Sequence, residues 1–204
     1  MKIDIDTSQL NYIKDMVEGI KNGYQKVVVG AINQTLTTAK VQAKARIGNE
    51  LNLTAARIDE DLSIQKASYT KLYGALIAKG EPVGLINFGA NQTMKGVSVK
   101  VLKASTTTLL KHAFIAHGKN SEKEHVFWRA KRQAGTKFPV GKKTNVPWPM
   151  FSDKYRMPLE RLTGPRIEDI FAQPKVLDPV TIQANHLLLQ NAEKNLDAVL
   201  QGYK

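Results

Sequence analysis

The sequence predicts an α+β fold with long N-terminal helices, an antiparallel β-sheet core, an extended basic loop and a C-terminal helix. Apolar residues recur every three or four positions before residue 50 and again near the C-terminus, which is typical of amphipathic helices. Between residues 95 and 129 they alternate at every second position, which is typical of strands. We expect three segments: helices packing on the core over residues 1–62, the antiparallel β domain over 63–170 with its loop at 129–155, and the C-terminal helix over 171–204.

Two helices are expected before residue 50. The first covers about residues 8–22, where the apolar residues are spaced by three and four (Leu10, Ile13, Val17 and Ile20) and Asn22-Gly23 supplies a stop. The second covers about residues 24–47 and ends at Gly48-Asn49, with one apolar stripe: Val28, Ile32, Leu36, Ala39, Ala43 and Ile47. We expect this long helix to pack on the chain's own sheet, with a neighbouring subunit as the alternative partner.

A short helix and a strand should follow. Thr54 is a suitable N-cap for a helix running through Ala55 and Ile58 to Leu62. From Ser63 the period changes, and residues 68–79 alternate as a strand that is buried on both faces for part of its length.

Three strands are expected next, and we predict that they form the heart of the domain. Val97, Val99 and Val101 alternate with Ser98, Lys100 and Leu102, and the second and third strands cover residues 111–116 and 125–129. The connections between them are short, and the second strand stops at His117-Gly118-Lys119-Asn120, so the three strands should form an antiparallel meander.

The remaining chain should contain a loop, a strand and two helical stretches. The loop at 129–155 is interrupted by glycine and proline, and four of its residues suggest packing against another subunit: Trp148, Met150, Phe151 and Tyr155. Residues 157–162 are a strand candidate and 166–171 a helical turn. The last helix should start at Asp178-Pro179, carry Ile182, Leu189, Leu196 and Leu200, and stop at Gly202.

The net charge of +12 is concentrated in the middle of the chain, where residues 95–143 contain twelve Lys or Arg against Glu122 and Glu124. Such a field favours polyanions or acidic protein surfaces. The candidate contact residues are Lys100, Lys103, Arg129, Lys131, Arg132, Lys137, Lys142 and Lys143. A basic solvated surface without a nucleic-acid role is the equal alternative, because these residues lack the interleaved aromatics of single-strand binders.

No motif in the sequence predicts catalysis. A nucleophile elbow, a phosphate-binding glycine loop and cysteine are all absent, so we expect no enzyme, no catalytic residue and no cofactor. His112, His117 and His125 could be imagined as metal ligands, but their spacing matches no familiar pattern, and we expect ordinary histidines. The acidic run at 59–61 is most simply a solvated face. No apolar run is long enough to cross a bilayer, and the N-terminus lacks the apolar stretch of a signal peptide, so neither membrane insertion nor export is expected.

Five segments, taken in order, resemble the prophage minor tail protein Z family of tailed bacteriophages. They are GAINQTLTTAKVQAKARI (30–47), NFGANQTMKGVSVKVLK (87–103), HAFIAHGK (112–119), HVFWRA (125–130) and PLERLTGPRI (158–167). In that family a long helix rich in Ala, Thr, Lys and Arg precedes a basic β-region with a Phe-Gly-Ala step and a Gly-Val-Ser-Val strand. The matched order covers about residues 30–170, and the longer insertion at 129–155 departs from the family pattern.

The resemblance implies a structural virion protein that completes the tail at its head-proximal end and links tail to head. Such proteins form rings around the DNA channel, here expected to be a hexamer. The implied partners are copies of the chain itself, the tail tube, the tail terminator, the head connector and the DNA in the channel. The protein would be made in the host bacterial cytoplasm and reside in the tail or neck of the virion. A basic nucleic-acid-binding module is the alternative, and a metal-dependent enzyme using the histidines is the third hypothesis.

Overall fold

The expected combination of helices and antiparallel sheets is present, which confirms the α+β class. The structure is a computed structural model that describes residues 2–4, 10–118, 122–129 and 159–202. The helices are α1 (Ile13–Met16), α2 (Gly23–Glu50), α3 (Ala55–Glu60), α4 (Ile167–Phe171) and α5 (Pro174–Gln201), with the 3-10 helix η2 (Leu85–Phe88). The strands are β1 (Lys2–Asp4), β2 (Leu62–Gln65), β3 (Ala75–Ala78), β4 (Asn91–Thr93), β5 (Gly96–Val99), β6 (Thr108–Lys111), β7 (Phe114–His117), β8 (Glu124–Arg129) and β9 (Leu159–Arg161).

The chain folds into two compact units. The helical unit comprises Met1–Val83, Leu102–Ala104 and Pro165–Lys204, and the β unit comprises Gly84–Val101 and Ser105–Gly164. This division differs from the three segments expected from the sequence, because β2, β3 and the C-terminal helix lie with the N-terminal helices. Within the described parts of the chain, no helix is long and apolar enough to cross a membrane.

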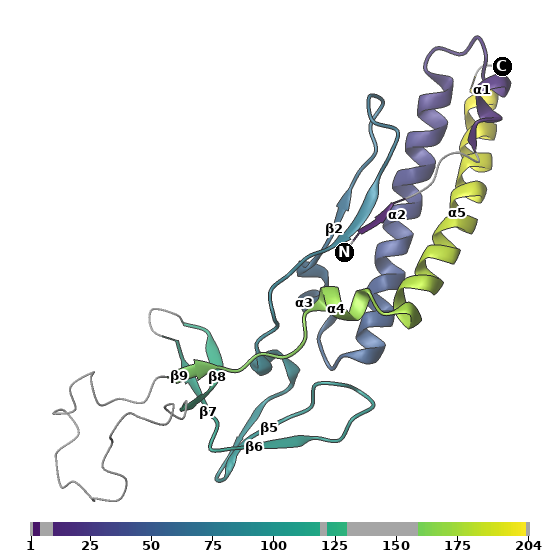
Figure 1. The fold of residues 1–204 in the computed structure, drawn as a ribbon. Coiled ribbons are helices and arrows are strands. Elements are labelled where there is room, and N and C mark those ends of the chain that lie inside the picture. The colour runs from purple at the N-terminus through teal and green to yellow at the C-terminus, as the bar shows by residue number, and fades with distance from the viewer. Residues whose placement is uncertain (1, 5–9, 119–121, 130–158, 203–204) are drawn as a thin grey trace, which may run out of the picture. The chain divides into compact units, whose positions relative to one another are not determined.

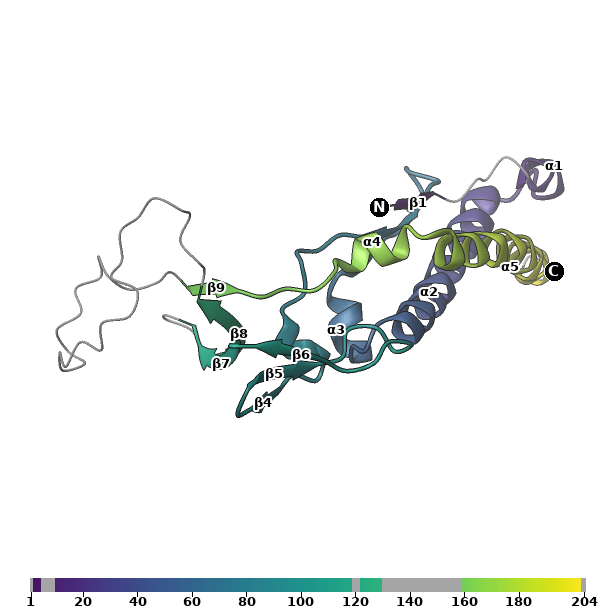
Figure 2. The ribbon, with the colours of Figure 1, turned by 60° about the horizontal axis from the view of Figure 1, so that its bottom comes forward.

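The core of the helical unit is the pair α2 and α5, which lie side by side in both views (Figures 1 and 2). All six residues of the predicted α2 stripe are buried. The facing stripe of α5 is also buried and recurs every four residues: Val176, Val180, Ala184, Leu188, Ala192 and Leu196. Polar links also cross this interface: the side-chain amide of Asn191 donates to the fully buried Thr35 hydroxyl at 3.0 Å, and that of Asn195 donates to the Val27 carbonyl at 3.4 Å. The main partner of α2 is therefore a helix, whereas the sequence suggested a sheet.

The expected sheet does contact α2, on a smaller scale. Antiparallel strands in the order β1-β3-β2 form it, and β3 is largely buried as predicted. A Cβ atom added at Gly74, just before β3, would lie 2.6 Å from Cδ1 of Leu36 and 2.8 Å from Cγ2 of Ile32, so a side chain here would displace those of α2. Asn33 of α2 also binds both backbone groups of Ala67, accepting its N–H at 2.9 Å and donating to its carbonyl at 3.2 Å.

The ends of two helices differ from expectation. The predicted helix over 8–22 is reduced to α1 and turns, because Gly19 and Asn22 have positive φ values of 88° and 58°, which a right-handed helix cannot contain. Its apolar residues Leu10, Ile13 and Val17 are nevertheless buried. The following helix, α2, continues through Gly48 and Asn49 to Glu50.

The last helix starts earlier than predicted. It begins at Pro174, and Pro179, expected near its first turn, lies inside it. Its buried stripe is consequently different from the predicted one, and Ile182 is 70% exposed. The stop at Gly202 is confirmed, as are the Thr54 cap of α3, the strand at β9 and the helical turn at α4.

The β unit contains two sheets in place of the predicted single meander. Its strands pair antiparallel in the orders β4-β5-β6 and β7-β8-β9 (Figure 2). The predicted strand at 111–116 is divided at His112, whose φ of 64° interrupts the extended backbone between β6 and β7. The segment before His112 therefore pairs with β5, and the segment after it pairs with β8.

Replacing Asn33 by Ala should destabilise the helical unit by about 1–3 kcal/mol, because the buried Ala67 would lose both partners of its backbone groups. Urea denaturation followed by helical circular dichroism measures this change. The control is Thr38→Ala, an exposed position on the same helix whose hydroxyl donates to the Gln34 carbonyl one turn earlier; it should change stability by less than about 0.5 kcal/mol. Equal effects for both variants would contradict a role for Asn33 in holding the connection between β2 and β3 on α2.

Candidate functional site

The positive charge of the chain is concentrated in the β unit. This unit contains fourteen Lys or Arg and four Asp or Glu, so it carries +10 of the chain's net +12. The larger helical unit is close to neutral, with the remaining +2. A candidate site for an anionic partner therefore belongs to the β unit.

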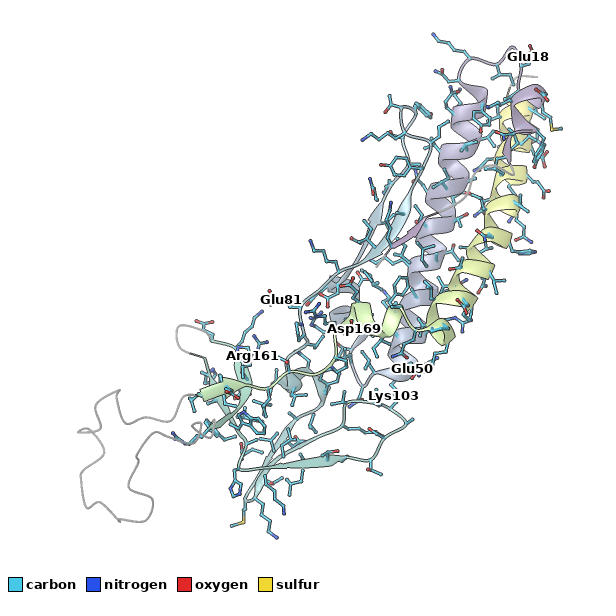
Figure 3. All side chains as sticks on the ribbon, in the orientation of Figure 1. Glu18, Glu50, Glu81, Lys103, Arg161 and Asp169 are labelled. Atoms are coloured by element: carbon cyan, nitrogen blue, oxygen red, sulfur yellow. The ribbon has the colours of Figure 1, made fainter. Side chains whose placement is uncertain are left out.

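The structure describes three of the eight basic residues singled out from the sequence. Lys100 follows β5 and Arg129 ends β8, both in the β unit. Lys103 belongs to the helical unit, where its backbone N–H donates to the Glu50 carbonyl at 2.9 Å; both residues are marked in Figure 3. Lys131, Arg132, Lys137, Lys142 and Lys143 lie outside the described residues, as do Trp148, Met150, Phe151 and Tyr155.

One face of the β7-β8-β9 sheet combines aromatic rings with arginines, and we call it the aromatic–cationic face: Phe114, His125, Phe127, Arg129 and Arg161. The register places Phe127 directly opposite both Phe114 and Arg161, and residues opposite one another share a face. The rings of Phe114 and Phe127 are 6.2 Å apart. The Arg129 guanidinium lies 5.9 Å from the centre of the Phe114 ring, within cation–π range.

This face was missed from the sequence. Along the sequence, the basic residues lack interleaved aromatics. In the folded sheet, strand pairing brings Phe114 and Phe127 beside Arg129. Arg161, marked in Figure 3, comes from a strand far along the chain, so its place on the face depends on the register of β8 and β9. The alternation in residues 125–129 was the available signal, since it puts His125, Phe127 and Arg129 on one side.

On the opposite face of this sheet a side-chain hydrogen bond links β8 to β9. The indole N–H of Trp128 donates to a carboxylate oxygen of Glu160 at 2.9 Å, although the Trp128 side chain remains 44% exposed. Val126, on the same face of β8, is buried. On this side of β8 Val126 packs into the core, whereas the aromatic–cationic face presents cations and half-buried rings.

Burial of His125 lowers its pKa, and the nearby positive charges of Arg161 and Lys123 lower it further. Its Nδ1 atom is buried and makes no hydrogen bond among the described residues. The ring meets Phe127 edge-on, with centroids 6.0 Å apart. The imidazole is therefore held neutral on the aromatic–cationic face.

The other candidate histidines, His112 and His117, lie at the ends of strands. His117 Nδ1 lies 2.9 Å from the Glu122 carbonyl, and His112 occupies the backbone break between the two sheets. In the described ranges no three His, Asp or Glu residues gather closely enough to hold a metal.

The acidic run is more engaged than a solvated face would be. Asp59 binds Lys40 and Lys44 at 3.1 and 3.2 Å, and the hydrogen bonds from Lys40 and then Lys44 lower the pKa of Asp59. Asp61 lies 3.0 Å from Arg57, and its side chain is only 12% exposed. The pairs of Asp59 connect α2 to α3, and the pair of Arg57 with Asp61 joins α3 to its own C-terminal cap residue.

Comparisons with protein-family models, curated proteins and solved structures found no match to this chain.

Stability should depend on pH through His125. Because its pKa is lowered in the folded protein, the unfolded chain binds this proton more readily, and the free energy of unfolding should fall as the pH drops below about 6.5. Above that range the ring is neutral in both states and the contribution disappears. Denaturation of the wild type and of His125→Gln at about pH 7.5 and about pH 5.5 measures the difference, which should be smaller in the variant.

A nuclear magnetic resonance titration provides the second measurement. Arg161→Gln should raise the pKa of His125 toward its ordinary value by removing a neighbouring positive charge. A wild-type His125 that titrates at or above the ordinary value would contradict the description of this face.

Proposed function

We propose that the chain is a structural protein of a tailed bacteriophage, a tail completion or neck protein at the head-proximal end of the tail. It links the tail to the head and surrounds the DNA channel as a ring of six copies. Its other partners are the tail tube, the tail terminator and the head connector. On this proposal the chain works through contacts, in the tail or neck of the virion, after synthesis in the host cytoplasm.

The proposal is carried by the coincidence between the segments that resemble the tail protein Z family and the elements that form the two cores. The first segment, 30–47, lies within α2 and contains most of its buried stripe. The second, 87–103, includes β4 and β5, whose Val97 and Val99 are buried. The remaining three contain β7, β8 and β9. The resemblance therefore falls on residues that determine packing, which supports a shared fold.

The charge of the β unit and the length of the helical pair support the same role. A basic β unit suits a protein that lies close to DNA, because positive charge attracts the phosphate backbone without reading its sequence. A long helical pair offers extended surfaces for lateral contacts between copies in a ring.

Labelling should place the protein at the joint between head and tail. Virions that carry an epitope tag on this chain, decorated with antibody and imaged by electron microscopy, should show label at that joint, and native mass spectrometry of the isolated ring should give six copies. Tagged tail-tube protein, labelled along the tail, serves as the control. Label confined to infected-cell cytoplasm, or joints that lack the protein, would reject the proposal.

A stand-alone nucleic-acid-binding module is the second candidate, favoured by the +10 charge of the β unit. It predicts that binding to duplex DNA weakens with salt, with a log–log slope of about −0.9 for each phosphate contact. Replacing Lys131, Arg132, Lys142 and Lys143 together by Gln should make this slope less negative.

The matched control makes the same change of charge in the helical unit, at four exposed lysines: Lys21, Lys26, Lys66 and Lys71. It should leave the slope close to that of the wild type. Absence of DNA retention at low salt would remove this second candidate.

A further inference from the structure

The hairpin of β4 and β5 presents an exposed apolar side chain at its tip. Figure 2 shows β4 and β5 joined by a tight turn. Thr93 pairs with Gly96, so the turn consists of Met94 and Lys95. The relative exposure of Met94 is 105%, the highest among the large apolar residues that the structure describes. Full exposure of such a side chain costs free energy that burial against a partner would recover.

The turn is held by hydrogen bonds on every side. The Thr93 hydroxyl donates to the Gly96 carbonyl at 2.8 Å, and the backbone N–H of His112 donates to the Lys95 carbonyl at 3.1 Å. The side-chain amide of Gln92 donates to the Gly96 carbonyl at 3.2 Å and accepts from the Ile115 N–H at 2.8 Å. The tip is therefore preorganised, which reduces the entropy lost on binding.

Gly96 adds a steric constraint to this turn. Its φ is 150°, and a Cβ atom at this position would lie 2.1 Å from the Leu110 carbonyl oxygen, so only glycine fits. The close contact with β6 keeps the turn in one conformation.

Two lysines lie at this end of the sheet. Lys95 is in the turn itself, and Lys111 of β6 is directly opposite Gly96; both are exposed. Leu109 shares the outer face of β6 with Lys111 and is 40% exposed. No Asp or Glu occurs between Glu81 and Glu122 in the sequence. We call Met94, Lys95, Leu109 and Lys111 the tip patch.

The composition of the tip patch favours a protein partner over DNA. Proteins that bind DNA through its backbone typically make about 6–10 phosphate contacts, and the tip patch offers two lysines. Two apolar side chains flanked by two charges match the anatomy of a protein interface, in which an apolar anchor, often Met, is surrounded by a polar rim. The positive rim requires negative charge on the partner.

We propose that the tip patch docks into an apolar socket rimmed by Asp and Glu on another protein of the virion. Met94 and Leu109 enter the socket, and Lys95 and Lys111 face its acidic rim. This inference rests on the proposed function, which supplies the particle in which the partner resides.

The test measures binding of the purified full chain to isolated tails and to isolated heads. Both come from a mutant of the phage that encodes the chain, in which this gene is inactivated. Met94→Ala, Lys95→Glu and Lys111→Glu should each weaken binding at least about fivefold, the loss expected for an interface anchor. Met94→Leu keeps the apolar volume and should stay within about twofold of the wild type.

Two control variants match these changes elsewhere. Met16→Ala truncates a methionine that is 53% exposed on α1, and Lys71→Glu reverses an exposed lysine in the loop between β2 and β3. Both should bind as the wild type does, and circular dichroism should show every variant folded.

The outcomes separate the two proposals. A wild-type chain that binds neither tails nor heads overturns the proposed function together with the docking role. A wild type that binds while the tip variants bind equally well overturns the docking role alone. Displacement of the wild type by a duplex DNA fragment, with no effect of the tip variants on binding to nuclease-treated particles, would assign binding to DNA and also overturn the inference.

Discussion

The helical unit depends on the packing of α2 against α5, because neither helix could keep its apolar stripe out of water alone. Both stripes combine large and small residues: α2 supplies Ile32 and Leu36 beside Ala39 and Ala43, and α5 alternates larger residues with Ala184 and Ala192. Small residues on one helix allow the other to approach closely, as ridges pack into grooves. The buried bond between Asn191 and Thr35 adds a polar link that favours one alignment of the helices over shifted ones. The β1-β3-β2 sheet then covers part of α2, held by Asn33 and by the absence of a side chain at Gly74.

The two units of the fold also differ in net charge. The helical unit balances its charges in part through local ion pairs, as between Lys40, Lys44 and Asp59, whereas the β unit accumulates positive charge with few carboxylates. Self-repulsion in such a unit costs free energy unless an anionic surface lies nearby. These charges suit the proposed ring protein. The basic β unit can bind a polyanion, and the nearly neutral helical unit can contact neighbouring copies.

Local features of the fold were predictable from the sequence, and pairings between distant segments were not. The α2 stripe, the Thr54 cap and the alternation at 125–129 depend on neighbouring residues, so periodicity and capping chemistry revealed them. The division of the predicted strand at His112 depends on a positive φ at a residue that usually avoids it. The early start of α5 was obscured by Pro179, which favours a helix start but is accommodated inside this helix. On the candidate site, Arg129 was identified from charge alone, whereas Phe114 and Arg161 join it only through strand register.

The helical unit is discontinuous in sequence, since the β unit is inserted between Val83 and Pro165, interrupted by Leu102–Ala104. A ribosome therefore completes α2 long before it synthesises α5, and the apolar stripe of α2 lacks its main partner throughout translation of the β unit. The β unit, whose strands are mostly close in sequence, can form its pairs during that interval. Chaperones that bind exposed apolar helices would encounter this chain before α5 has been made. Premature termination before residue 174 would release a polypeptide that lacks α5 and is prone to aggregate.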